Sequence, residues 1–203
     1  MADEKQREAH TLNEDVLDRI RHIIGDEKPI VVSVHAEEAI SINEIPQALA
    51  ICIAGRLGLS FDTEIIQTAK VSRTGADGFH RLANPPPFAG TFPQGASAII
   101  VDDTLTQGGT FASLRGLIER EGGRVLLATA LTGKQYSSTL AIEHETLRQL
   151  RQLYEPLETW WQQEFGYGFD SFTESEARYL IKSRQDADTI RTRVLAARQA
   201  PGE

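Results

Sequence analysis

The sequence predicts an α/β protein built on a parallel sheet, and three observations support this prediction. Short apolar runs rich in β-branched residues, typical of buried strands, lie at 30–34, 98–101 and 125–131. Segments with helical spacing of apolar residues separate these runs, as the crossovers of a parallel sheet require. From residue 137 onward the pattern is helical only. We therefore expect a parallel sheet flanked by helices, with a helical C-terminal cover.

The chain is expected to have three parts, which follow one another without an internal repeat. They are an N-terminal helix within 1–28, a core at 29–133 and the cover at 134–203. In the first part, apolar residues recur at helical spacing from Leu12 to Ile24, and Gly25 ends the helix.

The first half of the core is predicted as strand, helix and strand. The run 30–34 is the first strand, and 45–57 is a buried helix that ends at Gly58. A second strand is expected at 62–71. The irregular region 72–96, which is rich in glycine and proline, is long enough to be a functional lid.

The second half of the core begins with the clearest strand of the sequence, at 98–101. It leads through Asp102 and a glycine-bearing turn to a helix at 110–121, and the strand at 125–131 follows. In the cover, Thr173 and Glu176 have the spacing of a capping box that opens a short helix. A further helix is expected at Leu147–Leu157. Another is expected to run toward Arg198, with Ser183 as its N-cap.

Charge and composition exclude several classes of protein. The chain has 203 residues and a net charge of −8, from 21 basic and 29 acidic residues, which argues against a general nucleic-acid binder. No apolar stretch is long enough to cross a membrane, and the N-terminus has no apolar core of a secretory signal. Cys52 is the single cysteine, so no disulfide forms within the chain, and we expect a reducing, cytoplasmic location.

The segment 98–110 carries the clearest chemistry. A buried strand delivers Asp102 and Asp103 at its carboxyl end, where open α/β sheets bind ligands. The two side chains point to opposite faces of the strand, so they have different roles. The glycines of the following turn and the helix start at Thr110 offer backbone N–H groups to a phosphate. The segment therefore predicts a site for a phosphorylated sugar.

These residues resemble the signature of type I phosphoribosyltransferases, in which an apolar strand leads into an acid pair, a threonine-rich loop and a helix. The resemblance covers about 29–133 and is specific in 98–111. Arg81, Asn84 and Phe88 are also similar to a pattern of the competence-associated ComF branch, and the ending Gly108-Gly109-Thr110 is similar to adenine phosphoribosyltransferases.

The resemblance implies an enzyme that transfers phosphoribose from 5-phosphoribosyl-1-pyrophosphate to a nitrogenous base. It implies that Asp102 and Asp103 bind the ribose and, through substrate and water, Mg²⁺. It implies a pyrophosphate loop at His35 and Ala36, and a homodimer. It places cations for the pyrophosphate on a flexible loop, at Lys70, Arg73 and Arg81. The phosphate would be bound by Thr104, Leu105, Thr106, Gln107, Gly108, Gly109 and Thr110.

Other functions are weighed on the same residues. A nucleotide-binding P-loop needs a lysine after its glycines, and a receiver domain needs a phospho-accepting aspartate after a later strand; the chain lacks both at the expected places. A non-catalytic sensor of phosphoribosyl pyrophosphate or a nucleotide is the alternative, favoured by the acids Glu37 and Glu38 and by Gln107. Thr106 stands where 6-oxopurine enzymes have an aspartate, so hypoxanthine and guanine are not favoured, and the sequence does not name the base.

Overall fold

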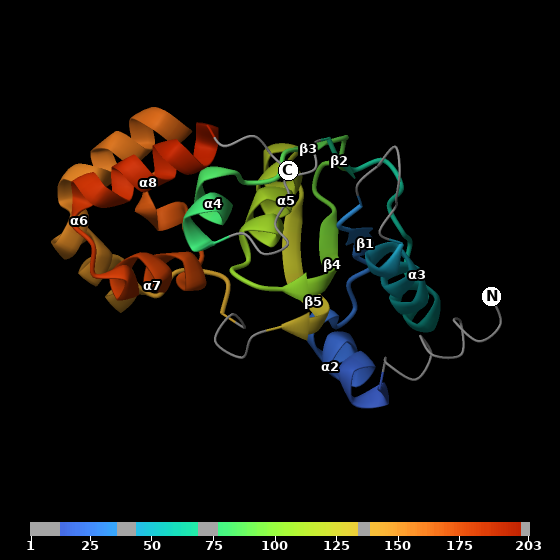
Figure 1. Ribbon diagram of the computed structural model, residues 1–203. Coiled ribbons are helices and arrows are strands. Elements are labelled where there is room, and N and C mark those ends of the chain that lie inside the picture. Colours follow the sequence, from blue (N-terminus) through green and yellow to red (C-terminus); the bar gives the residue numbers. More distant parts are fainter. Residues whose placement is uncertain (1–12, 36–43, 69–76, 134–138, 200–203) are drawn as a thin grey trace. The chain divides into compact units, whose positions relative to one another are not determined.

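The structure is a computed structural model, in which residues 13–35, 44–68, 77–133 and 139–199 are described (Figure 1). The chain forms two compact units. The first contains the described residues of 1–70, 87–105 and 113–132, and the second contains those of 71–86, 106–112 and 133–203. Among the described residues, no helix combines the length and the apolar character that crossing a bilayer needs.

A three-stranded sheet forms the centre of the first unit. Its strands are β1 (Ile30–Ser33), β4 (Ser97–Leu105) and β5 (Arg124–Gly133), in the order β1-β4-β5. β1 and β4 are parallel, with Ile30 opposite Ala98 and Ser33 opposite Val101. The first half of β4 is fully buried because β4 is the middle strand. The predicted fold class, a parallel α/β sheet flanked by helices, is confirmed.

Two helices complete the core of the first unit. Helix α2 (Glu14–Ile24) begins at Asn13, which accepts a hydrogen bond from Asp15 N at 2.5 Å, and ends at Gly25 as predicted. Helix α3 (Ile45–Leu57) contacts α2, β1 and β4, and its bounds are those predicted. Figure 1 shows α3 beside β1. The prediction that α3 is buried is only partly right, because Ile45 and Ile51 are 49% and 53% exposed.

The predicted second strand at 62–71 is only partly right over its described part. Phe61 forms a single parallel bridge with Val31, and the carboxylate of Asp62 then accepts a hydrogen bond from Ile65 N at 2.9 Å. This turn ends the pairing with β1. Only β2 (Ile66–Gln67) follows, and it pairs antiparallel with β3 (Phe88–Ala89).

The region 72–96 also differs from the prediction, since its described part contains regular structure. Helix α4 (Gly78–Ala83) begins after Asp77, whose carboxylate accepts a hydrogen bond from His80 N at 2.8 Å. Strand β3 follows the proline run. A helix this short leaves almost no apolar periodicity in the sequence, so only its cap could have predicted it.

The second unit is helical, as the cover was predicted to be. Helices α6 (His144–Phe165), α7 (Glu174–Ser183) and α8 (Ala187–Gln199) pack with α4 and a short 3-10 turn, η2 (Phe169–Ser171). α5 (Gly109–Arg120) links the two units along the chain. The core of the second unit is aromatic, because Trp161 is fully buried, stacked on Phe165 at 4.5 Å between ring centroids.

Two helix starts in the second unit were predicted from their cap residues, and one of the two caps is confirmed. Thr173 and Glu176 form the capping box of α7 that their spacing predicted. Ser183 does not cap the next helix: its hydroxyl donates to Leu180 O at 2.7 Å. Asp186 is the N-cap of α8 instead, since its carboxylate accepts a hydrogen bond from Thr189 N at 2.8 Å.

Close packing at Gly123 generates a first prediction. A Cβ at this residue would lie 2.4 Å from the ring of Phe92, which is buried, and 3.0 Å from Ile118. We expect Gly123→Ala to lower the free energy of unfolding by about 1–3 kcal/mol, because a buried ring would have to move. Chemical denaturation followed by circular dichroism measures this.

The matched control is Gly55→Ala. Gly55 lies inside α3, and a Cβ there would meet nothing within 4 Å. This substitution should raise the free energy of unfolding by about 0.5–1 kcal/mol, since alanine favours the helix. Equal effects of the two substitutions would contradict the packing described for Gly123.

Candidate functional site

Asp102 and Asp103 lie on β4 itself, not after it. The sequence predicted that the strand ends at Val101, but β4 continues to Leu105. The main chain of β1 reaches the same point, where Val34 N donates to Val101 O at 2.8 Å. β1 therefore ends beside Val101, and both acids follow on β4 directly beyond this point. This is the edge at which parallel sheets bind ligands.

The two acids have different surroundings, as alternation along a strand requires. Asp102 is 9% exposed, and one of its carboxylate oxygens accepts a hydrogen bond from Asp103 N at 2.8 Å. Asp103 is half-buried. Carboxylate oxygens accept hydrogen bonds, so this pair suits a ligand that brings hydroxyl groups.

Strand β5 contributes a residue that the sequence did not identify. The hydroxyl of Thr132 donates to Asp103 O at 3.3 Å and lies 3.2 Å from the hydroxyl of Thr104. These contacts fix the main chain next to the acid pair. The only signal in the sequence was the position of Thr132 at the end of a predicted strand.

The loop that follows the acids is shorter than predicted. It contains Thr106, Gln107 and Gly108, because β4 runs to Leu105 and α5 begins at Gly109 instead of Thr110. Gly108 has a φ of +87°, a conformation that glycine adopts at little cost, and its carbonyl accepts a hydrogen bond from Ala112 N at 2.9 Å. Gln107 O accepts a hydrogen bond from the hydroxyl of Thr173, at 2.6 Å, within the second unit.

The chemistry of this loop is that of an anion site. The first N–H groups of α5 have no partner within the helix, and the helix dipole adds positive potential there. Thr106 and Thr110 are half-buried and carry hydroxyl groups. These groups can donate to a phosphate without a lysine or an arginine.

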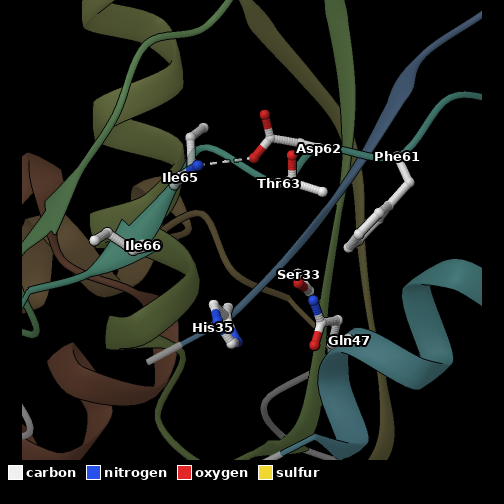
Figure 2. Close-up of a pocket in the computed structure, with 8 residues that line it drawn as sticks. All are labelled: Ser33, His35, Gln47, Phe61, Asp62, Thr63, Ile65 and Ile66. Atoms are coloured by element: carbon white, nitrogen blue, oxygen red, sulfur yellow. Dashed lines mark hydrogen bonds between the residues drawn. The ribbon is translucent and has the colours of Figure 1, made fainter. Parts of the chain in front are cut away.

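A cavity of about 50 Å³ lies in the first unit, beyond the carboxyl end of β1. Figure 2 shows Asp62 and Thr63 on one side, and Ser33, His35 and Gln47 on the other. Phe61, Ile65 and Ile66 complete its lining. Its volume is enough for a few water molecules or one small polar group.

His35 is the predicted site residue that lies at this cavity. Its Nδ1 is buried and has no hydrogen-bond partner among the described residues, while its carbonyl accepts a hydrogen bond from Gln67 N at 2.6 Å. A buried ring nitrogen without a partner is costly, so it is available to a ligand or a water molecule. Sequence reasoning missed Ser33, Gln47 and Asp62, which three separate segments bring to this cavity.

Of the remaining predicted site residues, one lies on helix α4 and the others lie outside the described residues. Arg81 is half-buried on α4, in the second unit. Ala36, Lys70 and Arg73 lie outside the described residues, and so do Glu37 and Glu38. Their predicted roles stay predictions.

Among the described residues, Asp102 and Asp103 are the candidates to hold Mg²⁺. The described part of the chain contains no group of three or more histidine, cysteine, aspartate or glutamate side chains that could bind a metal. The two adjacent carboxylates of β4 are hard oxygen ligands, of the kind Mg²⁺ uses when substrate and water complete its coordination. Magnesium binding stays a prediction.

Comparison with known proteins gives two close relatives. Over 188 residues, or 92% of the chain, the sequence is 43% identical to the protein TraN of Escherichia coli, of which the match covers 42%. Over 110 residues, or 54% of the chain, it is 46% identical to an uncharacterized protein of Haemophilus influenzae, of which the match covers 25%. The chain therefore spans less than half the length of the curated relatives it matches. No family model matches it.

Solved structures to which the chain is similar include an adenine phosphoribosyltransferase. The identity is 15%, the TM-score is 0.43, and the match covers 61% of this chain and 70% of that one. For the orotate phosphoribosyltransferase of Aeropyrum pernix the identity is 19%, the TM-score 0.36, and the coverage 60% and 59%. Both of these structures are phosphoribosyltransferases, to which the chain is similar at 15% and 19% identity.

Proposed function

We propose that the chain binds 5-phosphoribosyl-1-pyrophosphate and transfers its phosphoribosyl group to a nitrogenous base, with release of pyrophosphate. One observation carries the proposal. The acids Asp102 and Asp103 lie at the carboxyl edge of the central strand, and only the loop 106–108 separates that strand from the start of α5. Hydrogen-bond acceptors for sugar hydroxyls and N–H donors for a phosphate thus occur a few residues apart.

The reaction forms one bond and breaks one. A ring nitrogen of the base bonds to C1 of the ribose, while the bond from C1 to the pyrophosphate oxygen breaks and the electron pair leaves with the pyrophosphate. Positive charge develops on the sugar ring. Asp102 and Asp103 would accept hydrogen bonds from the ribose hydroxyls and, as carboxylates, stabilise that charge. The loop 106–108 and the first turn of α5 would hold the 5-phosphate and so fix the sugar.

The pyrophosphate leaving group needs positive charge, which Mg²⁺ and basic side chains would supply. Mg²⁺, when bound, would neutralise developing charge on the pyrophosphate. Lys70, Arg73 and Arg81 are the candidate cations. His35, at the end of β1, has a buried Nδ1 that could donate or accept a hydrogen bond there.

Removing the charge of the acid pair is the direct test. In Asp102→Asn and Asp103→Asn, the side chain no longer accepts hydrogen bonds as a carboxylate, and we expect the affinity for phosphoribosyl pyrophosphate to fall about 10- to 100-fold. Isothermal titration calorimetry measures the affinity, and pyrophosphate release measures turnover.

The matched control is Glu119→Gln. Glu119 lies on α5 in the same unit, and its carboxylate pairs with Arg115 at 2.6 Å on the surface. This substitution also removes one negative charge, so it should leave binding and turnover unchanged. If the two aspartate variants behave like the control, the proposed ribose site is wrong.

The non-catalytic sensor remains the second candidate, because Gln107 and two further acids, Glu37 and Glu38, depart from the pattern of the enzymes. The two functions are separated by incubating the wild-type protein with phosphoribosyl pyrophosphate, Mg²⁺ and a panel of purine and pyrimidine bases. An enzyme releases pyrophosphate with at least one base. Saturable binding without release on any base would favour the sensor.

The conformation of the loop gives a further prediction. Gly108→Ala places a Cβ at a φ of +87° and within 2.7 Å of Leu140, so we expect it to weaken binding of ribose 5-phosphate at least tenfold. Gly95→Ala is the control, since Gly95 has a φ of +77° and open space around a Cβ. The control should lower the melting temperature without changing the affinity. Equal affinities of the two variants would contradict a phosphate site at the loop.

A further inference from the structure

We propose that Thr173, at the start of helix α7, is a positioning residue that fixes the peptide between Gln107 and Gly108. It thereby orients the loop 106–108, which we call the phosphate loop. The contact itself is independent of the ligand. The assignment of a sugar phosphate as that ligand rests on the proposed function. All residues that carry the inference belong to the second unit.

The hydroxyl of Thr173 has two partners, and their geometry decides the direction of each hydrogen bond. Glu176 N donates to this hydroxyl at 3.1 Å, as in any N-terminal cap. The hydroxyl carries one proton, which is directed to Gln107 O at 2.6 Å. Thr173 is 2% exposed, so water cannot easily replace either partner. The cap of α7 and the phosphate loop therefore share one side chain.

The fixed carbonyl determines where a neighbouring N–H group points. Gln107 C=O and Gly108 N–H belong to one peptide plane, and the described residues contain no cis peptide bond. In a trans peptide, the C=O and N–H bonds point in opposite directions. Because the Gln107 carbonyl faces Thr173, the Gly108 N–H faces away from α7. It is thereby free to act as a donor in the loop.

Packing around Gly108 restrains the same peptide from a second side. A Cβ there would lie 2.7 Å from Leu140 and 3.3 Å from the methyl group of Thr173. Leu140 is itself tied to α7, since its carbonyl accepts a hydrogen bond from Glu174 N at 3.1 Å. The loop thus lies against both the methyl and the hydroxyl of Thr173.

The start of α7 is held rigidly enough to act as an anchor. Glu174 is 2% exposed, and its carboxylate accepts hydrogen bonds from Glu143 N at 2.9 Å and from the Thr146 hydroxyl at 2.7 Å. It also forms an ion pair with Arg178. Burial by itself would raise the pKa of Glu174, but these hydrogen bonds outweigh it and hold that pKa below its usual value.

The contact with Thr173 concerns the main chain of Gln107 and not its side chain. The side-chain oxygen of Gln107 is buried, without a hydrogen-bond partner among the residues that the structure describes. The main chain of Gln107 is held in place by Thr173 whatever its side chain does.

The experiment separates the donor role of Thr173 from its capping role. Thr173→Asp keeps an acceptor for Glu176 N but has no proton for Gln107 O, while Thr173→Ser keeps both functions. The readout is amide hydrogen exchange of residues 106–112 by mass spectrometry, because Ala112 N is hydrogen-bonded to Gly108 O. We expect exchange about five- to tenfold faster in Thr173→Asp and within twofold of wild type in Thr173→Ser, for a loss of one hydrogen bond.

Asp186→Ala is the control for loss of a cap elsewhere in the second unit. It removes the hydrogen bond at the start of α8, so it should lower the melting temperature without changing exchange in 106–112. If Thr173→Asp does not fold, Thr173→Val is measured instead, with the same expected acceleration. Exchange in 106–112 that is equal to wild type, or equally accelerated by Asp186→Ala, would overturn the positioning role.

Binding of ribose 5-phosphate, measured on the same proteins by calorimetry, tests the ligand part of the inference. We expect the dissociation constant to rise about five- to tenfold in Thr173→Asp and to stay near wild type in Thr173→Ser. If exchange is accelerated but the dissociation constant is not changed, the loop does not bind the phosphate and the inference is overturned in that part. A wild-type protein that binds no ribose 5-phosphate contradicts the proposed function instead, and the exchange data still decide the role of Thr173.

Discussion

The parallel pairing of β1 with β4 is the constraint on which the candidate site depends. Ser33 stands opposite Val101, and Val34 N donates to Val101 O at 2.8 Å. In this register β1 ends beside Val101, directly before both acids on β4. A slip by one residue would turn Asp102 and Asp103 to the opposite faces of the sheet, because side chains alternate along a strand. The buried residues of β4 make such a slip costly, since it would exchange apolar and charged positions.

Elements with local signals in the sequence could be predicted closely. Helix α3 has its predicted bounds, because an apolar segment ends at Gly58, whose φ of +64° favours glycine. The end of β4 could not be predicted in this way. Aspartates have low strand propensity, yet β4 runs through Asp102 and Asp103 to Leu105. Similarly, the hydrogen bond from Ile65 N to Asp62 forms a turn in the first half of the predicted second strand, and only Ile66–Gln67 of its described part is strand.

The candidate site could be predicted where its residues are adjacent in the sequence and not where they are distant. The acid pair and the glycine loop lie within one segment, so their order alone indicated a phosphorylated sugar. Thr132 contacts the main chain of Asp103 from 29 residues away, and Thr173 contacts Gln107 from 66 residues away. Thr173 was recognised as a cap because a capping box is local. Nothing local shows that the same hydroxyl has a second partner.

The net charge of −8 opposes a phosphate ligand, and the proposed site would avoid this conflict by using main-chain donors. Backbone N–H groups at the start of a helix carry positive potential without adding a charged side chain. Their effect depends on direction, because a peptide that rotates by half a turn presents its carbonyl instead. A donor that is oriented before the ligand arrives also avoids the cost of ordering it upon binding. The orientation of the Gln107–Gly108 peptide therefore decides whether the proposed site presents a donor or an acceptor at this point. A buried hydroxyl such as that of Thr173 is well suited to fix this orientation, since it can donate to the carbonyl and adds no charge of its own.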